Sequence, residues 1–209
     1  PLAQYLISCG IKNLNIFDDD IIKKNNLNRQ NLYTIKELGN KKVEIAKKKL
    51  LEINPYANIK ILSKKITNKN INLLKNSSII IDTSDNWKTM ILINKYCVTN
   101  NIPLISASAL GFDIQIALFA NQINNHLCLQ CIFPNNKEPE LARCEAAGIL
   151  GTAAGLAGIL CAQKTINFLM KFENNNQLLT LINCKTISIN NIKIEKNKQC
   201  KLLKFKKIN

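Results

Sequence analysis

The sequence predicts an α/β fold in which helices cover both faces of a mostly parallel β-sheet, with antiparallel strands near the C-terminal end. Short apolar runs alternate with helix-like segments through the first half of the chain, and this order produces parallel strands joined by helices. Two further strand-like runs follow one another near the C-terminal end. The chain has 209 residues, of which 46% are hydrophobic, so we expect one domain over 1–209 with a sizeable core.

The expected helices are recognised from apolar periodicity and flanking residues. Segment 40–54 carries lysines opposite an apolar stripe, and Pro55 ends it. Segment 86–101 is predicted to be a second long helix, and 1–10 and 70–76 are predicted to be shorter ones. The stripe of the first helix consists of Val43, Ala46, Leu50 and Ile53.

The expected strands are short apolar runs, some of them bounded by polar residues. The run "SIIID" is typical of a strand buried on both faces, because it lacks the alternation of a half-exposed strand. The expected strands are 13–18, 58–62, 78–82, 103–108, 113–119, 178–182 and 186–193.

The segment "AAGILGTAAGLAGILCA" at 146–162 is uncharged and allows two interpretations. Its length is near the lower limit for a membrane span, and Gly151/Gly155 and Ala154/Gly158 are small residues at the spacing of membrane helix dimers. However, alanine and glycine predominate, and Gln163 follows at once. We favour a helix packed closely in a protein core or at a subunit interface, and expect no membrane association.

The composition limits the kinds of partner and the cellular compartment that we expect. A formal charge of +15 suits an anionic partner, but the lysines are dispersed and lack interleaved aromatic residues. We therefore expect no nucleic-acid binding, and attribute the charge to a lysine-rich, solvated surface. Eight scattered cysteines do not form a secreted disulfide pattern. A reducing compartment is expected: the cytoplasm, or a plastid stroma or organelle matrix.

Acidic residues follow two of the predicted strands. Asp18 to Asp20 come after "NLNIF", and Asp82 and Asp85 come after or close to "SIII". In open α/β sheets, ligands bind beyond the carboxyl ends of the strands. A carboxylate there suits a ribose hydroxyl, and another suits Mg²⁺, although an Asp at such a place also caps a helix.

Between these acidic groups lies an Asn-Leu-x-Arg-Gln core, with a lysine thirteen residues after the arginine. With the other motifs, this order resembles the E1-like adenylyltransferases that activate ubiquitin-like sulfur carriers, a family that includes ThiF, MoeB and the ubiquitin-activating enzymes. The family has a Rossmann-like fold. The matching stretches are "NLNIFDDD", "NNLNRQNLY", "GNKKVEIAKKKLLEINP", "IIIDTSDNWKT", "PLISASALGFDIQI", "CLQC" and "ARCEAAGI".

The resemblance implies a reaction and roles for its residues. The carboxylate of a carrier ending in Gly-Gly attacks the α-phosphorus of ATP, giving an acyl-adenylate and pyrophosphate. Positive groups would stabilise the developing charge, and no general base is needed because a carboxylate is already ionised. The implied residues are Asp18 for the ribose, Asn26, Arg29, Gln30 and Lys42 for the phosphates, and Asp85 for Mg²⁺.

Two cysteine motifs carry further expectations from the family. Cys144, just before the predicted helix at 146–162, matches a cysteine implicated in a covalent link to the carrier. Cys128 and Cys131 match the first half of a zinc site, and Cys200 matches the start of the second half. Leu203 stands where the fourth cysteine belongs, so zinc is expected only with a substitute such as His126 or Cys184. A redox pair at Cys128/Cys131 is the alternative.

The chain looks most like ThiF, of thiamine biosynthesis, and the implied partners are a ThiS-like sulfur carrier, a sulfur-donor protein and a second copy of the chain. The family places a glycine-rich loop ahead of the residue matching Pro1, so 1–209 reads as an adenylation domain lacking that loop and its strand. The alternatives are MoeB-type activation of the molybdopterin synthase small subunit and a non-catalytic carrier-binding homologue. A Rossmann-type dehydrogenase is disfavoured, because Gly-x-Gly-x-x-Gly is absent from the sequence given.

Overall fold

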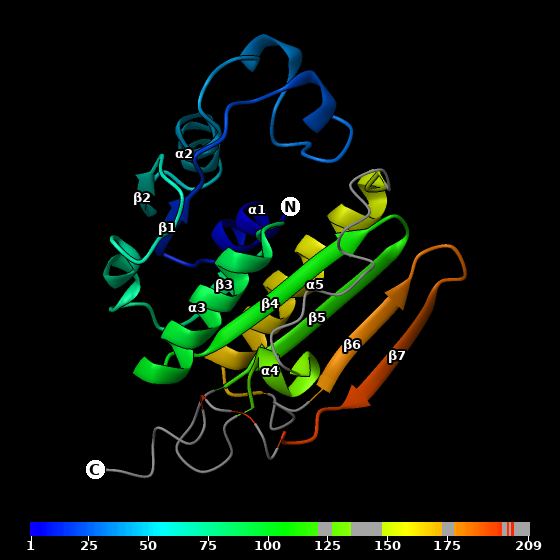
Figure 1. The fold of residues 1–209 in the computed structure, drawn as a ribbon. Coiled ribbons are helices and arrows are strands. Elements are labelled where there is room, and N and C mark those ends of the chain that lie inside the picture. The colour runs from blue at the N-terminus through cyan, green and yellow to red at the C-terminus, as the bar shows by residue number, and fades with distance from the viewer. Residues whose placement is uncertain (121–126, 135–147, 173–177, 198–199, 201, 203–209) are drawn as a thin grey trace.

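A computed structural model describes residues 1–120, 127–134, 148–172, 178–197, 200 and 202 (Figure 1). Most predicted elements lie within two or three residues of their expected bounds. The helices are α1 (Leu2–Ser8), α2 (Lys42–Ile53), α3 (Trp87–Asn100), α4 (Leu129–Ile132) and α5 (Gly151–Leu169), with 3₁₀ turns at Lys24–Asn26, Ile35–Glu37 and Ile71–Leu74. The strands are β1 (Asn13–Phe17), β2 (Asn58–Leu62), β3 (Ile80–Asp82), β4 (Leu104–Leu110), β5 (Asp113–Phe119), β6 (Leu178–Asn183) and β7 (Ser188–Lys193).

The described strands form two sheets (Figure 1). β1 and β2 pair in parallel, and β3 to β7 form a five-stranded sheet in sequential order. In the larger sheet β3 and β4 are parallel, and every later pairing is antiparallel. The expected mixture of parallel and antiparallel strands is confirmed. Parallel pairing is confined to the first half of the chain, because β4 is joined to β5 by a tight turn rather than by a helix.

Helices cover both faces of the larger sheet, as expected, because successive residues of a strand point to opposite faces. Ile105 of β4 packs with Ile114 and Ile116 of β5 against Ala153 and other small residues of α5. These small side chains, Ala153, Ala157 and Cys161, let the helix lie close to the strands along its length (Figure 1).

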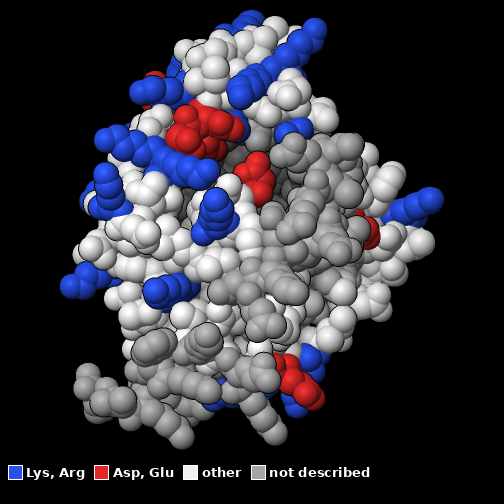
Figure 2. Space-filling view, viewed as in Figure 1, with Lys and Arg blue, Asp and Glu red and all other residues white. Residues whose placement is uncertain are grey.

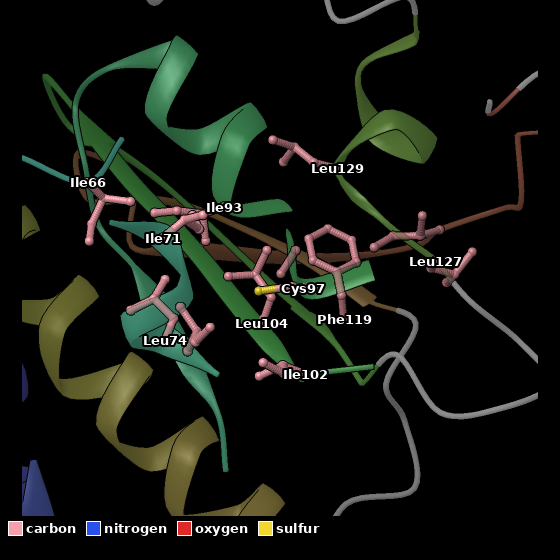
Figure 3. Packing of buried hydrophobic residues seen from close by; sticks show 13 residues of the cluster. Ile66, Ile71, Leu74, Ile93, Cys97, Ile102, Leu104, Phe119, Leu127 and Leu129 are labelled. Carbon is pink, nitrogen blue, oxygen red and sulfur yellow. The ribbon is translucent and has the colours of Figure 1, made fainter. Parts of the chain in front are cut away.

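The opposite face carries a second apolar core (Figure 3). Leu104, next to Ile105 in sequence, joins Phe119 and packs with Ile93 and Cys97 of α3. Leu129 of α4 and the 3₁₀ turn at Ile71–Leu74 close this core. Figure 3 shows Phe119 among these side chains, at the end of β5.

The smaller sheet has its own apolar core with α1 and α2. Ile7 of α1 and Leu50 of α2 are fully buried, and both pack with Ile59 of β2. The predicted stripe of 40–54 is therefore largely confirmed: Val43, Ala46 and Leu50 are buried, although Ile53 at the end of the helix is 43% exposed. Burial of this stripe, rather than helix propensity in a lysine-rich segment, holds α2 in place.

Helix α5 is the segment with two possible interpretations. It begins at Gly151 and continues to Leu169, seven residues beyond the uncharged stretch. No helix in the described part of the chain has the length and apolarity that crossing a membrane requires. The structure instead uses the small residues for close packing: a Cβ at Gly158 would lie 2.9 Å from the Leu2 backbone nitrogen of α1.

Two glycines of α5 should therefore respond differently to alanine. Gly155→Ala should raise the free energy of unfolding by up to about 1 kcal/mol, since alanine favours helix and no other atom lies within 4 Å of the new methyl group. Gly158→Ala should lower it, because α1 has to move away. Urea unfolding of both variants measures the difference. Equal effects would contradict the close approach of α1 to α5.

Candidate functional site

The acidic run that follows β1 is folded back on itself. The Asp18 carboxylate accepts a hydrogen bond from the backbone N–H of Asp20, at 2.8 Å. The Asp18 N–H continues the β1–β2 pairing by donating to the Leu62 carbonyl at 3.2 Å. Burial raises the pKa of Asp18, and it outweighs the opposing effects of the Asp20 hydrogen bond and the Lys42 charge. Asp18 is therefore held at the carboxyl end of β1, as the sequence predicts.

Lys42 contacts this acidic run directly. It is the first residue of α2 and is only 5% exposed. Its Nζ lies 2.7 Å from Oδ2 of Asp20, and its N–H donates to the Asp20 carbonyl at 3.0 Å. The hydrogen bond from Lys42 lowers the pKa of Asp20. The buried lysine is thus paired with a carboxylate to which the sequence analysis assigned no role of its own.

Tyr33 is a further member of this group that sequence reasoning missed. Its hydroxyl donates to the Lys42 carbonyl at 3.2 Å. Burial, with a smaller contribution from the charge of Asp18, raises the pKa of Tyr33 to about 12. The phenol therefore stays neutral and remains a donor at neutral pH. The motif "NLNRQNLY" contains the tyrosine, but no local pattern indicated that it reaches α2.

Arg29 lies in the loop between the first two 3₁₀ turns. Its Nη1 donates to the Asn25 carbonyl at 2.8 Å and to Oδ1 of Asn28 at 3.1 Å. Asn26 is 7% exposed, and its Oδ1 accepts a hydrogen bond from the Lys23 N–H at 3.2 Å. This side chain therefore stabilises the backbone of the loop. Gln30 Oε1 is buried, and no described residue gives it a hydrogen bond.

The Arg29 loop faces the start of α5 across a pocket of about 510 Å³. The loop contributes Asn28, Arg29 and Asn31 to its lining, and Leu150, Gly151 and neighbouring residues of α5 contribute the rest together with Pro1. Figure 2 shows acidic side chains gathered on one face of the molecule with lysine and arginine side chains around them. Anionic and cationic groups thus share this face, as a site for a metal-bound polyphosphate requires.

The two carboxylates after β3 differ in accessibility. Asp82 is 3% exposed, and its Oδ1 accepts from the Ser84 N–H at 3.0 Å. Burial raises the pKa of Asp82. Asp85 is exposed, and Asn86 beside it caps α3 by accepting from the Thr89 N–H at 3.0 Å. Asn86, and not Asp85, therefore caps the helix. Because the Asp85 carboxylate is exposed, it is the one of the two that can bind a solvated cation.

Contacts bring together only part of the predicted set. Asp18, Asp20, Tyr33 and Lys42 form one connected group. Within the described residues, neither Arg29 nor Asp85 makes a hydrogen bond or an ion pair with Lys42. Cys144 lies outside the described residues.

The raised pKa of Asp82 predicts a pH-dependent effect of Asp82→Asn. A carboxyl group with a raised pKa favours the folded state below its ordinary pKa, near 4, and loses that contribution as the pH rises through its folded value. The Asn variant should therefore be more stable than the wild type at pH 7, and the difference should shrink toward pH 4. Urea unfolding at both pH values tests this, with exposed Asp85→Asn as the control. A gain independent of pH would contradict it.

The expected zinc ligands lie close together in a small buried cluster. Cys128 and Cys200 are buried with their Sγ atoms 3.5 Å apart, and Cys131 packs against them. The Cys200 thiol donates to Oε1 of Gln130 at 3.1 Å. The Cys128 thiol, by hydrogen bonding, lowers the pKa of Cys131, and the pKa of Cys128 is raised in turn.

This cluster does not complete a zinc site. In the described part of the chain, no group of three or more His, Cys, Asp or Glu side chains is placed to hold a metal ion. A closed zinc site needs four ligands, and the described residues of this cluster supply three thiols, one of which donates a hydrogen bond to an amide oxygen. Of the substitutes considered, His126 lies outside the described residues, and Cys184 packs instead with the β4–β5–α5 core. The described residues therefore do not complete a four-ligand zinc site.

Comparison with known proteins identifies the family. The profile of the ThiF family matches residues 1–202. The Escherichia coli sulfur carrier protein ThiS adenylyltransferase is 30% identical over 201 residues, which cover 96% of this chain and 79% of that protein. The adenylyltransferase and sulfurtransferase MOCS3 of Drosophila virilis is 34% identical over 172 residues, and these cover 81% of this chain but only 38% of that protein.

Solved structures share the fold at lower identity. The crystal structure of E. coli MccB with MccA-N7isoASN has a TM-score of 0.83 and 20% identity, covering 96% of this chain and 62% of that one. MccB with ATP has a TM-score of 0.79 and 22% identity. The chain spans less than two thirds of the MccB chain.

The fold and these matches define an adenylyltransferase class of protein. The chain belongs to the ThiF family.

Proposed function

We propose that the chain catalyses ATP-dependent adenylation of the C-terminal carboxylate of a ubiquitin-like sulfur carrier ending in Gly-Gly. The observation that carries the proposal is the 30% identity, over 96% of the chain, to a protein named for the adenylation of the sulfur carrier ThiS. A ThiS-like carrier, and with it thiazole formation in thiamine biosynthesis, is the first choice. The relatives named MOCS3 support a MoeB-type carrier as the second.

In this proposal the basic residues bind the polyphosphate. Lys42, Arg29 and Asn26 hold phosphate oxygens, Gln30 completes the motif, and Asp18 holds the ribose. Lys42 is suited to its task because burial strengthens its field, while Asp20 keeps it oriented until the phosphates compete for its ammonium group. The carrier carboxylate attacks the α-phosphorus, pyrophosphate leaves, and positive charge stabilises the phosphoryl oxygens.

Mg²⁺ would bind through Asp85, whose exposed carboxylate suits a hard cation that keeps several of its waters. Bound there, the ion supplies positive charge to the phosphates. Asp82 is too buried to serve as a direct ligand, and its hydrogen bond with the Ser84 backbone supports the turn that presents Asp85.

The later sulfur step and the assembly are also part of the proposal. Cys144 forms the covalent link to the carrier, and a sulfur-donor protein supplies the sulfur that converts the acyl-adenylate to a thiocarboxylate. The chain acts as a homodimer in a reducing compartment such as the cytoplasm. The described cysteines, all free thiols, support such a compartment. Zinc would need a fourth ligand, such as His126, beside Cys128, Cys131 and Cys200.

The test is ATP–pyrophosphate exchange by this chain with a ThiS-like carrier and with the molybdopterin synthase small subunit. Each carrier is also tested after removal of its last two glycines. Exchange that needs the intact Gly-Gly end supports adenylation, and the faster carrier identifies the branch. Carrier binding without exchange, unchanged by ATP, would overturn the proposal and favour a non-catalytic carrier-binding protein.

A further inference from the structure

We propose that Gly151, the first residue of α5, is a positioning residue that sets the place of Arg29 through the backbone of Asn28. The inference rests on the proposed role of Arg29 in phosphate binding. It extends the site to a residue more than a hundred positions away in sequence, which lines the same pocket as Arg29.

The contact is one that only glycine permits. A Cβ on Gly151 would fall on the carbonyl oxygen of Asn28, well inside van der Waals contact, and would lie 3.3 Å from the carbonyl carbon and 3.6 Å from the Arg29 Cα. All three are backbone atoms, so no rotation of a side chain relieves the overlap. The nearest glycines on either side, Gly148 and Gly155, have no other atom within 4 Å of such a Cβ.

The loop, rather than the helix, is the part that has to move. α5 is fixed from its first turn onward, because Ala153, Ala157 and Cys161 are buried against β4 and β5. Asn28 is exposed and lies in a turn outside any regular element. A methyl group at Gly151 therefore displaces Asn28 while α5 keeps its place on the sheet.

Displacing Asn28 moves Arg29 in two ways. The carbonyl carbon of Asn28 is bonded to the Arg29 nitrogen, so the Arg29 backbone shifts with it. Oδ1 of Asn28 also accepts one of the hydrogen bonds that orient the guanidinium, at 3.1 Å. The pocket lies between this loop and α5, so the shift changes where the guanidinium stands relative to a bound phosphate. A misplacement of about 1 Å in a catalytic group costs on the order of 100-fold in rate.

The first arm of the test is a double-mutant cycle in ATP–pyrophosphate exchange. Gly151→Ala should lower kcat/KM for ATP by roughly 10- to 100-fold, while Gly148→Ala, the same change three residues earlier, leaves it unaltered. In the Arg29→Ala background, Gly151→Ala should lower kcat/KM by less than about 3-fold, because the group it positions is gone. Equal effects of Gly151→Ala in both backgrounds would overturn the inference.

The second arm does not depend on activity. Amide hydrogen exchange of a peptide covering 24–33 should be faster in Gly151→Ala than in the wild type and in Gly148→Ala, while peptides from β4 and β5 remain as protected as before. Unchanged exchange in 24–33 would overturn the inference. Absence of pyrophosphate exchange in the wild type would count against the proposed function, and this arm would still decide whether Gly151 positions the loop.

Discussion

Replacing Lys42 by alanine should reduce carrier-dependent ATP–pyrophosphate exchange by about 10²- to 10³-fold, the usual cost of one preorganised charge-stabilising group. The lysine is buried at the start of α2 and its ammonium group lies against Asp20, so its charge is held in one place. Stability should change little, because the Asp20 carboxylate is 54% exposed and is readily solvated once its partner is gone. Initial rates over a range of ATP concentrations give the change in kcat/KM.

Lys41 is a matched control for this variant. It precedes Lys42 directly, its side chain is 54% exposed, and it pairs with Glu44 on the helix surface at 3.6 Å. Lys41→Ala removes the same charge from the same end of α2 and should leave exchange nearly unchanged. A comparable loss in both variants would show that net charge near α2, and not the buried ammonium group, matters for the reaction.

The largest effect on stability is expected for Phe119→Ala, which should lower the free energy of unfolding by about 3–5 kcal/mol. Phe119 is 1% exposed and stands at the end of β5 among Leu104, Cys97 and Leu129 (Figure 3). These neighbours come from three different elements, and none can move far enough to fill the space of a phenyl ring. Urea unfolding measures the loss.

Phe112→Ala serves as the comparison, since this residue lies in the turn between β4 and β5 and is 47% exposed. It should cost well under half as much as Phe119→Ala. Similar losses for the two variants would contradict the assignment of Phe119 to the centre of the core.

The elements of this fold were largely predictable because their signals are local. The apolar run 58–62 is β2 without change, and the helix expected at 86–101 is α3 at Trp87–Asn100. The division into two sheets was not predictable, since strand order depends on contacts between distant segments. Helix α5 shows the same limit: its small residues were visible in the sequence, but whether they face lipid, a subunit or a sheet depends on tertiary packing.

The candidate site likewise contains residues that the sequence indicates locally and contacts that depend on the tertiary fold. Asp18, Arg29 and Lys42 could be named from the sequence because each lies in a short motif that resembles one of the E1-like family. Lys42 and Asp20, which form an ion pair, are 22 residues apart, and Tyr33, which donates to the Lys42 carbonyl, lies in a separate loop. No local sequence pattern therefore indicates either contact. Gly151 has no sequence signal for its contact with Asn28, because the two residues are more than a hundred positions apart.

Successive side chains of β4 point into two different apolar cores, and this has a consequence for synthesis of the chain on the ribosome. α3 precedes β4 and β5, so one face of the strands can be covered as soon as they emerge. The other face, with Ile105, Ile114 and Ile116, waits for α5, which is complete only 50 residues after Phe119, at Leu169. At bacterial and eukaryotic elongation rates that interval is roughly 3–10 s. For those seconds the nascent protein presents an apolar strip to solvent, and a chaperone that binds extended hydrophobic segments competes with the helix for it.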